Sequence, residues 1–458
     1  MTDMWIGIDD TDSRSGMCTT YLMALVVEEI AGAGLDIIGY PRLVRLNPSI
    51  PWKTRGNAAL AVRVGEGAGK KRIVSRVGGK NIYCFEREAK VRRKPRLVPK
   101  ASQGLQARKQ EPGRKEIFEK VNALIAKHAH LNDQNTNPGL VVADRILPES
   151  SYWNAVREIV EIDDAKKTLV AAGAEFAGYK NGRGLVGASA AVAWPAARKT
   201  YEIIAYRMKE NIGTQRQIYE QSVIAMDKAH PSTFDNYDYE NKVVKIAPNT
   251  PCPILFGIRA TNPDELPAAA GKIVSEPMER WLLFETNQGS DDHLVRRKAA
   301  GVKQFLSSII SGTVIEAPHE ITGGHVFFKI RDETGELECA AYEPTKQFRN
   351  IVRQLREGDE VTVYGATRDE RRTLNLEKIK VEKVAEILEK TENPFCACGA
   401  RMHSKGKDEY RCPKCGKKAP KSAARFVKVE RTLKPGWYEV PPIARRHLSR
   451  LIRLGLDG

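Results

Sequence analysis

The sequence lacks the features that direct a chain into or across a membrane. No apolar run approaches the roughly 18 residues that a membrane-spanning helix needs. The first residues also lack a basic stretch followed by an apolar one, which is the pattern of a secretory signal. We therefore expect an intracellular, cytoplasmic protein that binds no membrane. With 41% hydrophobic and 29% charged residues, its composition is that of a globular protein.

Acidic residues are too few to balance the basic ones. The 458 residues include 74 Lys and Arg but 57 Asp and Glu, which gives a formal net charge of +17. The basic residues concentrate in 66–130, with 18 against 6 acidic residues, and in 401–458, with 16 against 5. Such an excess favours a nucleic acid as partner. A solvated basic surface, and an insertion at 66–130 that has no role, are the alternatives.

The cysteines do not form the regular pattern of a disulfide framework. Four of the eight are scattered along the chain, and the other four lie within twenty residues: Cys396, Cys398, Cys412 and Cys415. The spacing C-x-C followed by C-P-K-C-G is typical of a structural zinc ribbon, because four thiolates can surround Zn²⁺ tetrahedrally. Two disulfides or free thiols are the alternative. We predict a ribbon at 393–421, followed by a basic C-terminal tail at 422–458.

The remaining length indicates several domains, at about 150 residues for each. Alternating strand-like and helix-like segments predict an α/β domain over 1–197, with a basic insertion at about 66–130. About four strands and two helices favour a ferredoxin-like domain over 198–292. Five strands, with a helix between the third and the fourth, predict an OB-fold over 300–388. The predicted fold is therefore multidomain α+β.

Three carboxylates follow a short apolar run, Met4–Ile8, which predicts a buried strand. Asp9, Asp10 and Asp12 offer the hard oxygen ligands that suit Mg²⁺ and its attached phosphates. One of them could instead form an Asx-turn or cap the helix that follows. Thr19 lies near the start of that helix, where it could be a capping residue, a core residue or a functional one.

The phosphate-binding motif G-x4-G-K-[ST] is absent, so an ATP site in this chain would not be of the Walker A type. Other basic residues and turn glycines are the candidates for phosphate contacts: Lys53, Arg55, Gly184 and Gly187. Surface charge and ordinary turns would explain the same residues equally well.

Four stretches carry a resemblance to a known family. They are GIDDTDSRSGMCTTY at 7–21, RLNPSIPWKTRGNAA at 45–59, GYKNGRGLVGA at 178–188 and ETNQGSDDHL at 285–294. Together with the predicted OB-fold and zinc ribbon, they resemble the archaeal tRNA-isoleucine 2-agmatinylcytidine synthetases. The resemblance spans nearly the whole chain.

The resemblance implies an ATP-dependent ligase. Members of the family join agmatine to the wobble cytidine of the isoleucine tRNA with a CAU anticodon, so that the tRNA decodes AUA. An N-terminal kinase-like domain phosphorylates the cytosine 2-oxo group and also a threonine, which matches Thr19 here. The implied cofactors are ATP, Mg²⁺ and structural Zn²⁺, and the implied partners are tRNA and agmatine, without an obligate protein partner.

The guanidinium of agmatine needs carboxylates around it, and Asp291 or Asp292 are the candidates. Among Asp9, Asp10 and Asp12, the residues alone do not indicate which binds a metal and which acts as a base. Two other functions stay open. One is a non-enzymatic nucleic-acid-binding protein built on the OB-fold and ribbon, and the other is an ATP-dependent kinase or ligase for a different small molecule.

Overall fold

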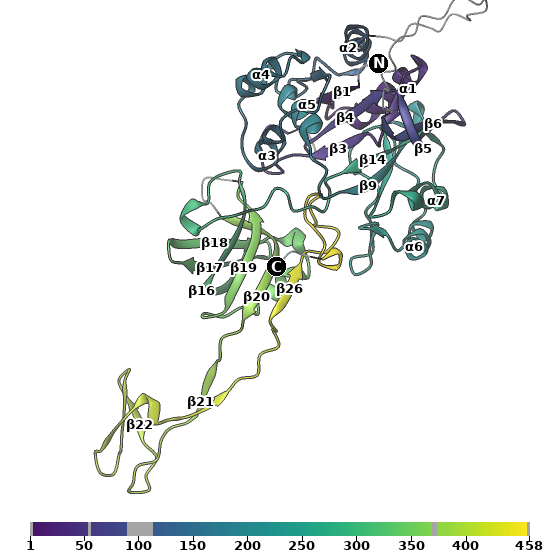
Figure 1. Ribbon diagram of the computed structural model, residues 1–458. Helices are drawn as coiled ribbons and strands as arrows, with labels where there is room; N and C mark the ends of the chain where they lie inside the picture. The colour runs from purple at the N-terminus through teal and green to yellow at the C-terminus, as the bar shows by residue number, and fades with distance from the viewer. Residues whose placement is uncertain (1–2, 54–55, 89–112, 369–372, 456–458) are drawn as a thin grey trace, which may run out of the picture.

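The computed structural model describes residues 3–53, 56–88, 113–368 and 373–455. A large body built on one long sheet is followed by a β-barrel and by an arm, which consists of a two-stranded stalk and a small tip (Figure 1). In the described part of the chain, no helix is long and apolar enough to cross a membrane. Of the predicted basic insertion, residues 89–112 lie outside the described residues, and the remainder forms two strands and a helix.

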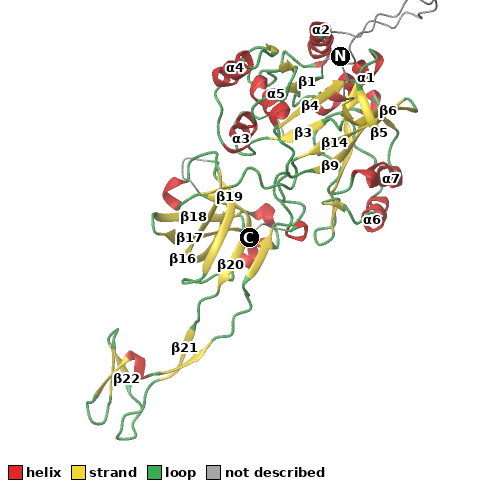
Figure 2. Cartoon of the chain, in the orientation of Figure 1, coloured by secondary structure: helices red, strands yellow, loops and turns green. Residues whose placement is uncertain are grey.

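Helices cover both faces of the sheet in the N-terminal part of the large body (Figure 2). Its elements are β1 (Met4–Asp9), α1 (Thr19–Gly32), β2 (Asp36–Ile38), β3 (Arg42–Arg45), β4 (Ala58–Gly65), β5 (Gly67–Val77), β6 (Lys80–Glu88), α2 (Arg114–His128), β7 (Gly139–Ala143), α3 (Glu149–Arg157), α4 (Ile162–Ala171), β8 (Glu175–Gly178) and α5 (Gly184–Ala193). The predicted strand is β1, which lies antiparallel between β4 and β7. The apolar face of α1 packs on one side of it, and α5, which is buried throughout, packs on the other.

The next part of the chain extends the same sheet instead of forming a separate one. Its elements are β9 (Thr200–Arg207), α6 (Glu220–Ala229), β10 (Thr233–Phe234), β11 (Tyr237–Asp238), β12 (Val243–Val244), β13 (Ile254–Ala260), α7 (Leu266–Lys272) and β14 (Met278–Thr286). Strand β14 pairs with β9 and β5 and, in parallel, with β3. The two helices were predicted, but β9, β10, β13 and β14 share one twelve-stranded sheet with the N-terminal strands, and β11 and β12 pair only with each other.

A closed barrel follows, and its strand order is the predicted one. It contains β15 (Val295–Arg296), β16 (Ser307–Ile321), β17 (His325–Asp332), β18 (Gly335–Ala341), α8 (Phe348–Val352), β19 (Glu360–Ala366) and β20 (Leu374–Lys383). The helix α8 lies between the third and the fourth long strand, and β16 closes the barrel by pairing with β19. This is the arrangement of an OB-fold.

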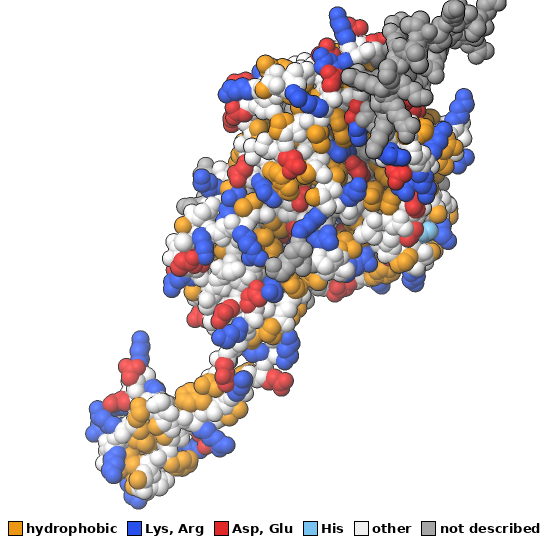
Figure 3. Space-filling model, in the orientation of Figure 1, with side chains coloured by type: hydrophobic (Ala, Val, Ile, Leu, Met, Phe, Trp, Pro, Cys, Tyr) orange, Lys and Arg blue, Asp and Glu red, His pale blue; other side chains and the backbone are white. Residues whose placement is uncertain are grey.

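The arm consists of a stalk and a small three-stranded sheet. Strands β21 (Leu388–Glu392) and β25 (Arg425–Lys428) pair to form the stalk, and β22 (His403–Lys405), β23 (Glu409–Arg411) and β24 (Lys418–Pro420) form the tip. Leu388, Phe426 and Val427 on the stalk are exposed. Figure 3 shows that the arm projects away from the rest of the molecule and that Lys and Arg side chains lie over the visible face of all three bodies.

The segment predicted as a tail returns to the large body. After the stalk, β26 (Gly436–Glu439) adds to the barrel by pairing with β20. The chain then hydrogen-bonds along the end of β14, where the amides of Gly289 and Asp291 donate to the carbonyls of His447 and Leu448, both at 2.9 Å. We call residues 440–455 the C-terminal segment. It connects the barrel to the large body.

Candidate active site

One pocket of about 420 Å³ lies where both parts of the large body meet the C-terminal segment. Its lining comes from the end of β1, the start of α1, the loop after β3, the start of α5, strand β9, the loop between β12 and β13, and residues 442–447. Residues from opposite ends of the chain therefore share one cavity. Its volume is that of a small-molecule or nucleotide site.

The three predicted carboxylates, those of Asp9, Asp10 and Asp12, all line this pocket. Strand β1 ends at Asp9, and the chain turns at Asp10, whose φ of 54° is in the left-handed region that Asp tolerates better than most residues. The backbone amide of Asn137 donates to the Asp10 carboxylate at 3.2 Å. The turn therefore directs this short acidic stretch into one cavity.

The carboxylates raise one another's pKa. Burial raises the pKa of Asp9 well above its usual range, and the charge of Asp10 adds to this. Burial, followed by the charge of Asp12, raises the pKa of Asp10 to about 7. A bound cation would relieve both effects, and oxygen donors are the ligands that Mg²⁺ prefers. The donor chemistry therefore suits Mg²⁺, but among the described residues only the four cysteines near the C-terminus bring three or more ligand atoms within 4.8 Å of one another.

Thr19 is the first residue of α1 and lines the pocket close to the carboxylates. The capping position belongs to Cys18, whose side chain makes no capping hydrogen bond. Of the roles considered for Thr19, the capping one is therefore wrong, because the residue already lies inside the first turn of the helix.

The predicted phosphate contacts have different surroundings. Lys53 and Gly187 line the pocket. Burial, with the charges of Arg368 and Arg446, lowers the pKa of Lys53 to about 8. Arg55 lies outside the described residues. Gly184 is not among the lining residues.

The two glycines of α5 serve different purposes. A Cβ on Gly187 would overlap the carboxylate of Asp9, so this glycine gives the acidic group its space. A Cβ on Gly184 would overlap the backbone of Gly139, so this glycine lets α5 pack closely on β7. Gly184 therefore has a packing role in the fold, and Gly187 has a role in the site.

Arg183 is a lining residue that sequence reasoning missed, although it lies in the GYKNGRGLVGA stretch. Its guanidinium stacks on the ring of Trp52, 4.5 Å from the centroid. It also interacts electrostatically with the carboxylates of Asp9 and Asp10. Its position one residue before the buried helix α5 could have identified it, since a charge there faces the acidic turn.

Asp291 and Asp292, the predicted agmatine ligands, are not among the lining residues. Asp291 pairs with the buried Lys378 at 2.7 Å, and Asp292 accepts a hydrogen bond from the hydroxyl of Tyr152 at 2.5 Å. Both carboxylates already join the barrel or α3 to the end of β14. Outside the acidic stretch, the carboxylates that line the described pocket are Glu158 and Glu202.

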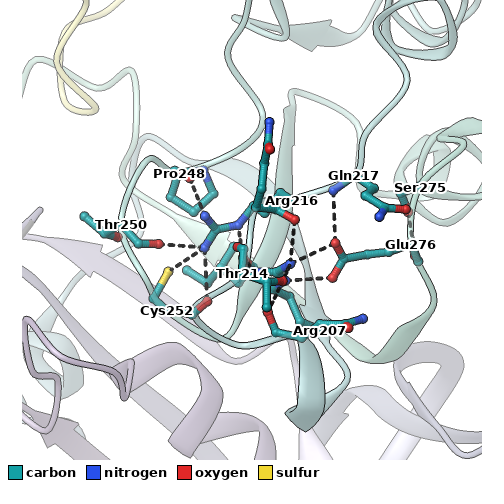
Figure 4. A network of polar contacts seen from close by, with 12 residues as sticks. Arg207, Thr214, Arg216, Gln217, Pro248, Thr250, Cys252, Ser275 and Glu276 are labelled. Atoms are coloured by element: carbon teal, nitrogen blue, oxygen red, sulfur yellow. Dashed lines mark hydrogen bonds and ion pairs between the residues drawn. The ribbon is translucent and has the colours of Figure 1, made fainter.

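One wall of the pocket, the loop between β12 and β13, is fixed by Arg216 (Figure 4). Its guanidinium donates at 2.7–3.0 Å to four backbone carbonyls, those of Pro248, Thr250, Cys252 and Ile254. Beneath it, the fully buried Arg207 makes a two-bond ion pair with Glu276, at 2.7 and 2.9 Å, and Glu276 also accepts the backbone amide of Gln217. Side chains from the second part of the large body therefore determine the shape of this loop.

The four clustered cysteines form a metal site at the tip of the arm. Their sulfur atoms all lie within 4.8 Å of one another. The closest pairs, Cys396 with Cys415 and Cys398 with Cys412, are 3.5 Å apart, which is far longer than a disulfide bond. Thiolates bound tetrahedrally to one zinc ion are about 3.8 Å apart, so the geometry fits Zn²⁺ with all four positions filled by the protein.

A pocket lined by an acidic stretch, joined to an OB-fold and a zinc ribbon, is typical of an enzyme that acts on a nucleic acid. Family models agree with this description. The TiaS TCKD domain matches residues 5–106 and 100–181, the TiaS FLD domain 182–293, the OB-fold nucleic acid binding domain 309–383 and the TiaS C-terminal zinc ribbon domain 393–433.

Curated relatives extend over the full length. The chain is 40% identical to TiaS of Methanocaldococcus jannaschii, a 2-agmatinylcytidine synthetase for an isoleucine tRNA, over 99% of both chains. It is 41% identical to the protein of the same name from Archaeoglobus fulgidus, over 99% of this chain and 98% of the relative. The chain therefore belongs to the family of tRNA-isoleucine 2-agmatinylcytidine synthetases, and the resemblance described above is confirmed.

Solved structures of the family have the same fold. A complex of TiaS with its isoleucine tRNA and ATP matches with a TM-score of 0.80 at 39% identity, and a complex of TiaS with the same tRNA, AMPCPP and agmatine matches with 0.80 at 37%. Apo TiaS matches with 0.77 at 40% identity. Each comparison covers 100% of this chain and 99% of the other. The predicted multidomain fold with an OB-fold and a C-terminal zinc ribbon is thereby confirmed.

Proposed function

We propose that this protein is an ATP-dependent ligase that joins agmatine to the wobble cytidine of the isoleucine tRNA with a CAU anticodon, so that the tRNA decodes AUA. Full-length relatives bear the name of this activity, and those in solved complexes bind the isoleucine tRNA, ATP or its analogue, and agmatine. The observation that carries the proposal is the pocket, which places the acidic stretch and Thr19 beside the second part of the sheet. A tRNA substrate agrees with a cytoplasmic location.

The chemistry needs the cytosine 2-oxo group to become a leaving group. Phosphorylation converts it to a phosphate ester, and the primary amine of agmatine then attacks C2 of the cytosine and displaces phosphate. Phosphoryl transfer depends mostly on positioning and charge neutralisation.

We assign this step to the N-terminal kinase-like domain, residues 1–197. Mg²⁺ held by Asp9, Asp10 or Asp12 would supply the neutralisation. Thr19 is the residue that we expect to accept a phosphoryl group itself.

Asp10 is the best candidate for the base that takes the proton from the agmatine amine. Without a bound cation its pKa is about 7, which leaves it partly ionised at neutral pH and a better proton acceptor than an ordinary aspartate, so this role leaves Mg²⁺ to Asp9 or Asp12. The N-terminal part also supplies Lys53 and, outside the described residues, Arg55 as phosphate contacts. Gly187 contributes space for Asp9.

Glu158 and Glu202, the pocket carboxylates outside the acidic stretch, are our candidates for the agmatine guanidinium, in place of Asp291 and Asp292. The side chain of Glu202 is 8% exposed, accepts a hydrogen bond from Gln288 at 2.5 Å and lies 4.0 Å from Arg45. Gly257 opposite it leaves room, because a Cβ there would lie 2.6 Å from the Glu202 carboxylate. A buried carboxylate selects amines that carry a guanidinium at the opposite end, because the two groups form paired, charge-assisted hydrogen bonds.

The test is mass spectrometry of the wobble nucleoside after incubation of the protein with the CAU-anticodon isoleucine tRNA, ATP and agmatine. We expect the mass of an agmatine adduct on cytidine, and its loss with Asp10→Ala. An unmodified nucleoside with the wild-type protein would refute the proposal. ATP consumption stimulated by tRNA would exclude a purely binding protein, and parallel reactions with other amines would exclude a different small-molecule substrate.

A further inference from the structure

A group of cationic side chains lines the same pocket from several parts of the chain. Arg45 ends β3, Lys245 follows β12, Arg259 lies on β13, and His447 belongs to the C-terminal segment. We call Arg45, Lys245 and Arg259 the cationic cluster, and the neutral ring of His447 lies beside them. The His447 ring is exposed to the pocket, and a Cβ on the neighbouring Gly56 would lie 3.7 Å from its Nε2 and 2.6 Å from a nitrogen of Arg45.

The cluster is one electrostatic unit. Enclosure by protein atoms, and then the charges of Arg45, Arg259 and Lys245, lower the pKa of His447 well below its usual range. Arg259 also lowers the pKa of Lys245, after burial. Side chains that repel one another in this way gain from an anion placed among them.

Carboxylates do not balance this charge on the pocket side. Asp235 pairs with Arg259 at 3.6 Å and also with Arg445. However, Asp235 is buried at 8% exposure and is not a lining residue. Glu202, 4.0 Å from Arg45, is the carboxylate that lines this part. In addition, the Nε of Arg45 is buried and has no hydrogen-bond partner. The described wall therefore presents more donors than its own acceptors use.

The C-terminal segment connects this wall with the OB-fold. Strand β26 pairs with β20 of the barrel, and His447 lies eight residues after its last residue, Glu439. Between them, the backbone amide of Ile443 donates to Asp238 at 3.1 Å, which fixes the segment to the large body. The segment therefore links the barrel directly to the wall of the pocket.

We propose that the cationic cluster binds a backbone phosphate of the tRNA next to the wobble cytidine, and thereby holds that nucleotide in the pocket. The proposal rests on the proposed function for the identity of the RNA. A phosphodiester carries one negative charge and needs no metal, so Lys and Arg donors suffice. The triphosphate of ATP also needs Mg²⁺ and carboxylates to hold that ion, and these carboxylates are in the acidic stretch.

Two variants test the cluster by equilibrium binding at several salt concentrations. Lys245→Met removes the charge and keeps the aliphatic chain, and Lys242→Met removes a charge from the turn between β11 and β12, at a residue that does not line the pocket. We expect Lys245→Met to weaken binding of the full-length tRNA about tenfold and to lower the slope of log K against log salt by about 1, with ATP affinity unchanged. Lys242→Met should change neither quantity by a comparable amount.

The phosphate is identified with synthetic RNA on the wild-type protein. An anticodon stem-loop carries an uncharged methylphosphonate on either side of the wobble cytidine, or in the stem as a control. We expect one of the two wobble replacements to weaken binding about tenfold, and the stem replacement to have little effect. With Lys245→Met, or with Lys245→Gln if the first variant does not fold, the wobble replacement should cause no further loss.

The proposal is overturned if Lys245→Met weakens ATP binding but not tRNA binding, since the anion would then belong to the nucleotide. It is also overturned if the losses from the variant and from the methylphosphonate multiply, because independent effects do so. If the wild-type protein binds the tRNA without transferring agmatine, the proposed function fails, while these binding measurements still decide for or against the cluster.

Discussion

Asp10 combines a left-handed backbone with a carboxylate whose pKa is about 7. The folded protein keeps a proton on Asp10 up to that pH, whereas the unfolded chain releases it near pH 4, at roughly the ordinary pKa of aspartate. Stability from this group is therefore present at low pH and is lost as pH rises through about 7. We expect the wild-type Tm to fall as the pH rises from about 5 to about 8, and Mg²⁺ to restore part of it at pH 8 only.

Asp10→Asn tests this expectation, because Asn also tolerates a positive φ. The variant should raise the Tm at pH 8 by about 2 °C or more, reduce the effect of Mg²⁺ and abolish agmatine transfer. Asp163→Asn, at an exposed position on α4, is the control and should leave the pH profile of the Tm unchanged. If the Tm of the wild type and of Asp10→Asn depended on pH in the same way, the raised pKa of Asp10 would be contradicted.

Gly187 and Gly184 provide a paired prediction. Gly187→Ala should lower the rate of agmatine transfer at least tenfold with little change in Tm, because the new methyl group displaces only the short side chain of Asp9. Gly184→Ala should lower the Tm by several degrees, because its methyl group meets the backbone of Gly139. Thermal unfolding and initial rates distinguish the two variants, and a loss of Tm in both would mean that Gly187 also has a packing role.

At the level of elements, Arg216 determines the shape of the loop between β12 and β13. Arg216→Lys leaves one ammonium to replace a guanidinium that contacts four carbonyls. We expect hydrogen exchange of the amides in residues 245–254 to become faster and kcat/KM for agmatine transfer to fall about tenfold. Arg331→Lys, on an exposed barrel hairpin, should change neither quantity. Unchanged exchange in the loop would contradict this role.

The elements that local sequence determines were predicted, and those that depend on distant pairing were not. Strand β1 and helix α1 follow from an apolar run and a helical period, and the OB-fold order follows from alternating strands. The parallel pairing of β3 with β14 joins Leu43 to Thr286 and leaves no local pattern. The same applies to Asp291 and Asp292, whose acidity suggested a ligand site although Lys378 and Tyr152 hold them elsewhere.

At the scale of the whole molecule, the candidate site needs three separate stretches of chain. The acidic stretch and Thr19 come from the start of the chain, the loop with Lys245 comes from the middle, and His447 comes from the end. Composition indicated the positive charge of the C-terminal residues but not its destination. That destination follows from β26, which pairs with the barrel and directs the chain back to the pocket.

The zinc site is the feature farthest along the arm, and its only described connection to the barrel is the two strands β21 and β25 and their flanking chain. Removing the metal should therefore unfold the tip and leave the pocket intact.

We expect Cys412→Ser, or a zinc chelator, to reduce tRNA affinity at least tenfold and to leave ATP affinity and the main thermal transition unchanged. Binding assays for both ligands, with zinc content measured on the same samples, check this. Ser404→Ala, at an exposed position on the tip outside the four ligands, is the control. A loss of ATP binding together with zinc would show that the arm supports the pocket as well as the tRNA.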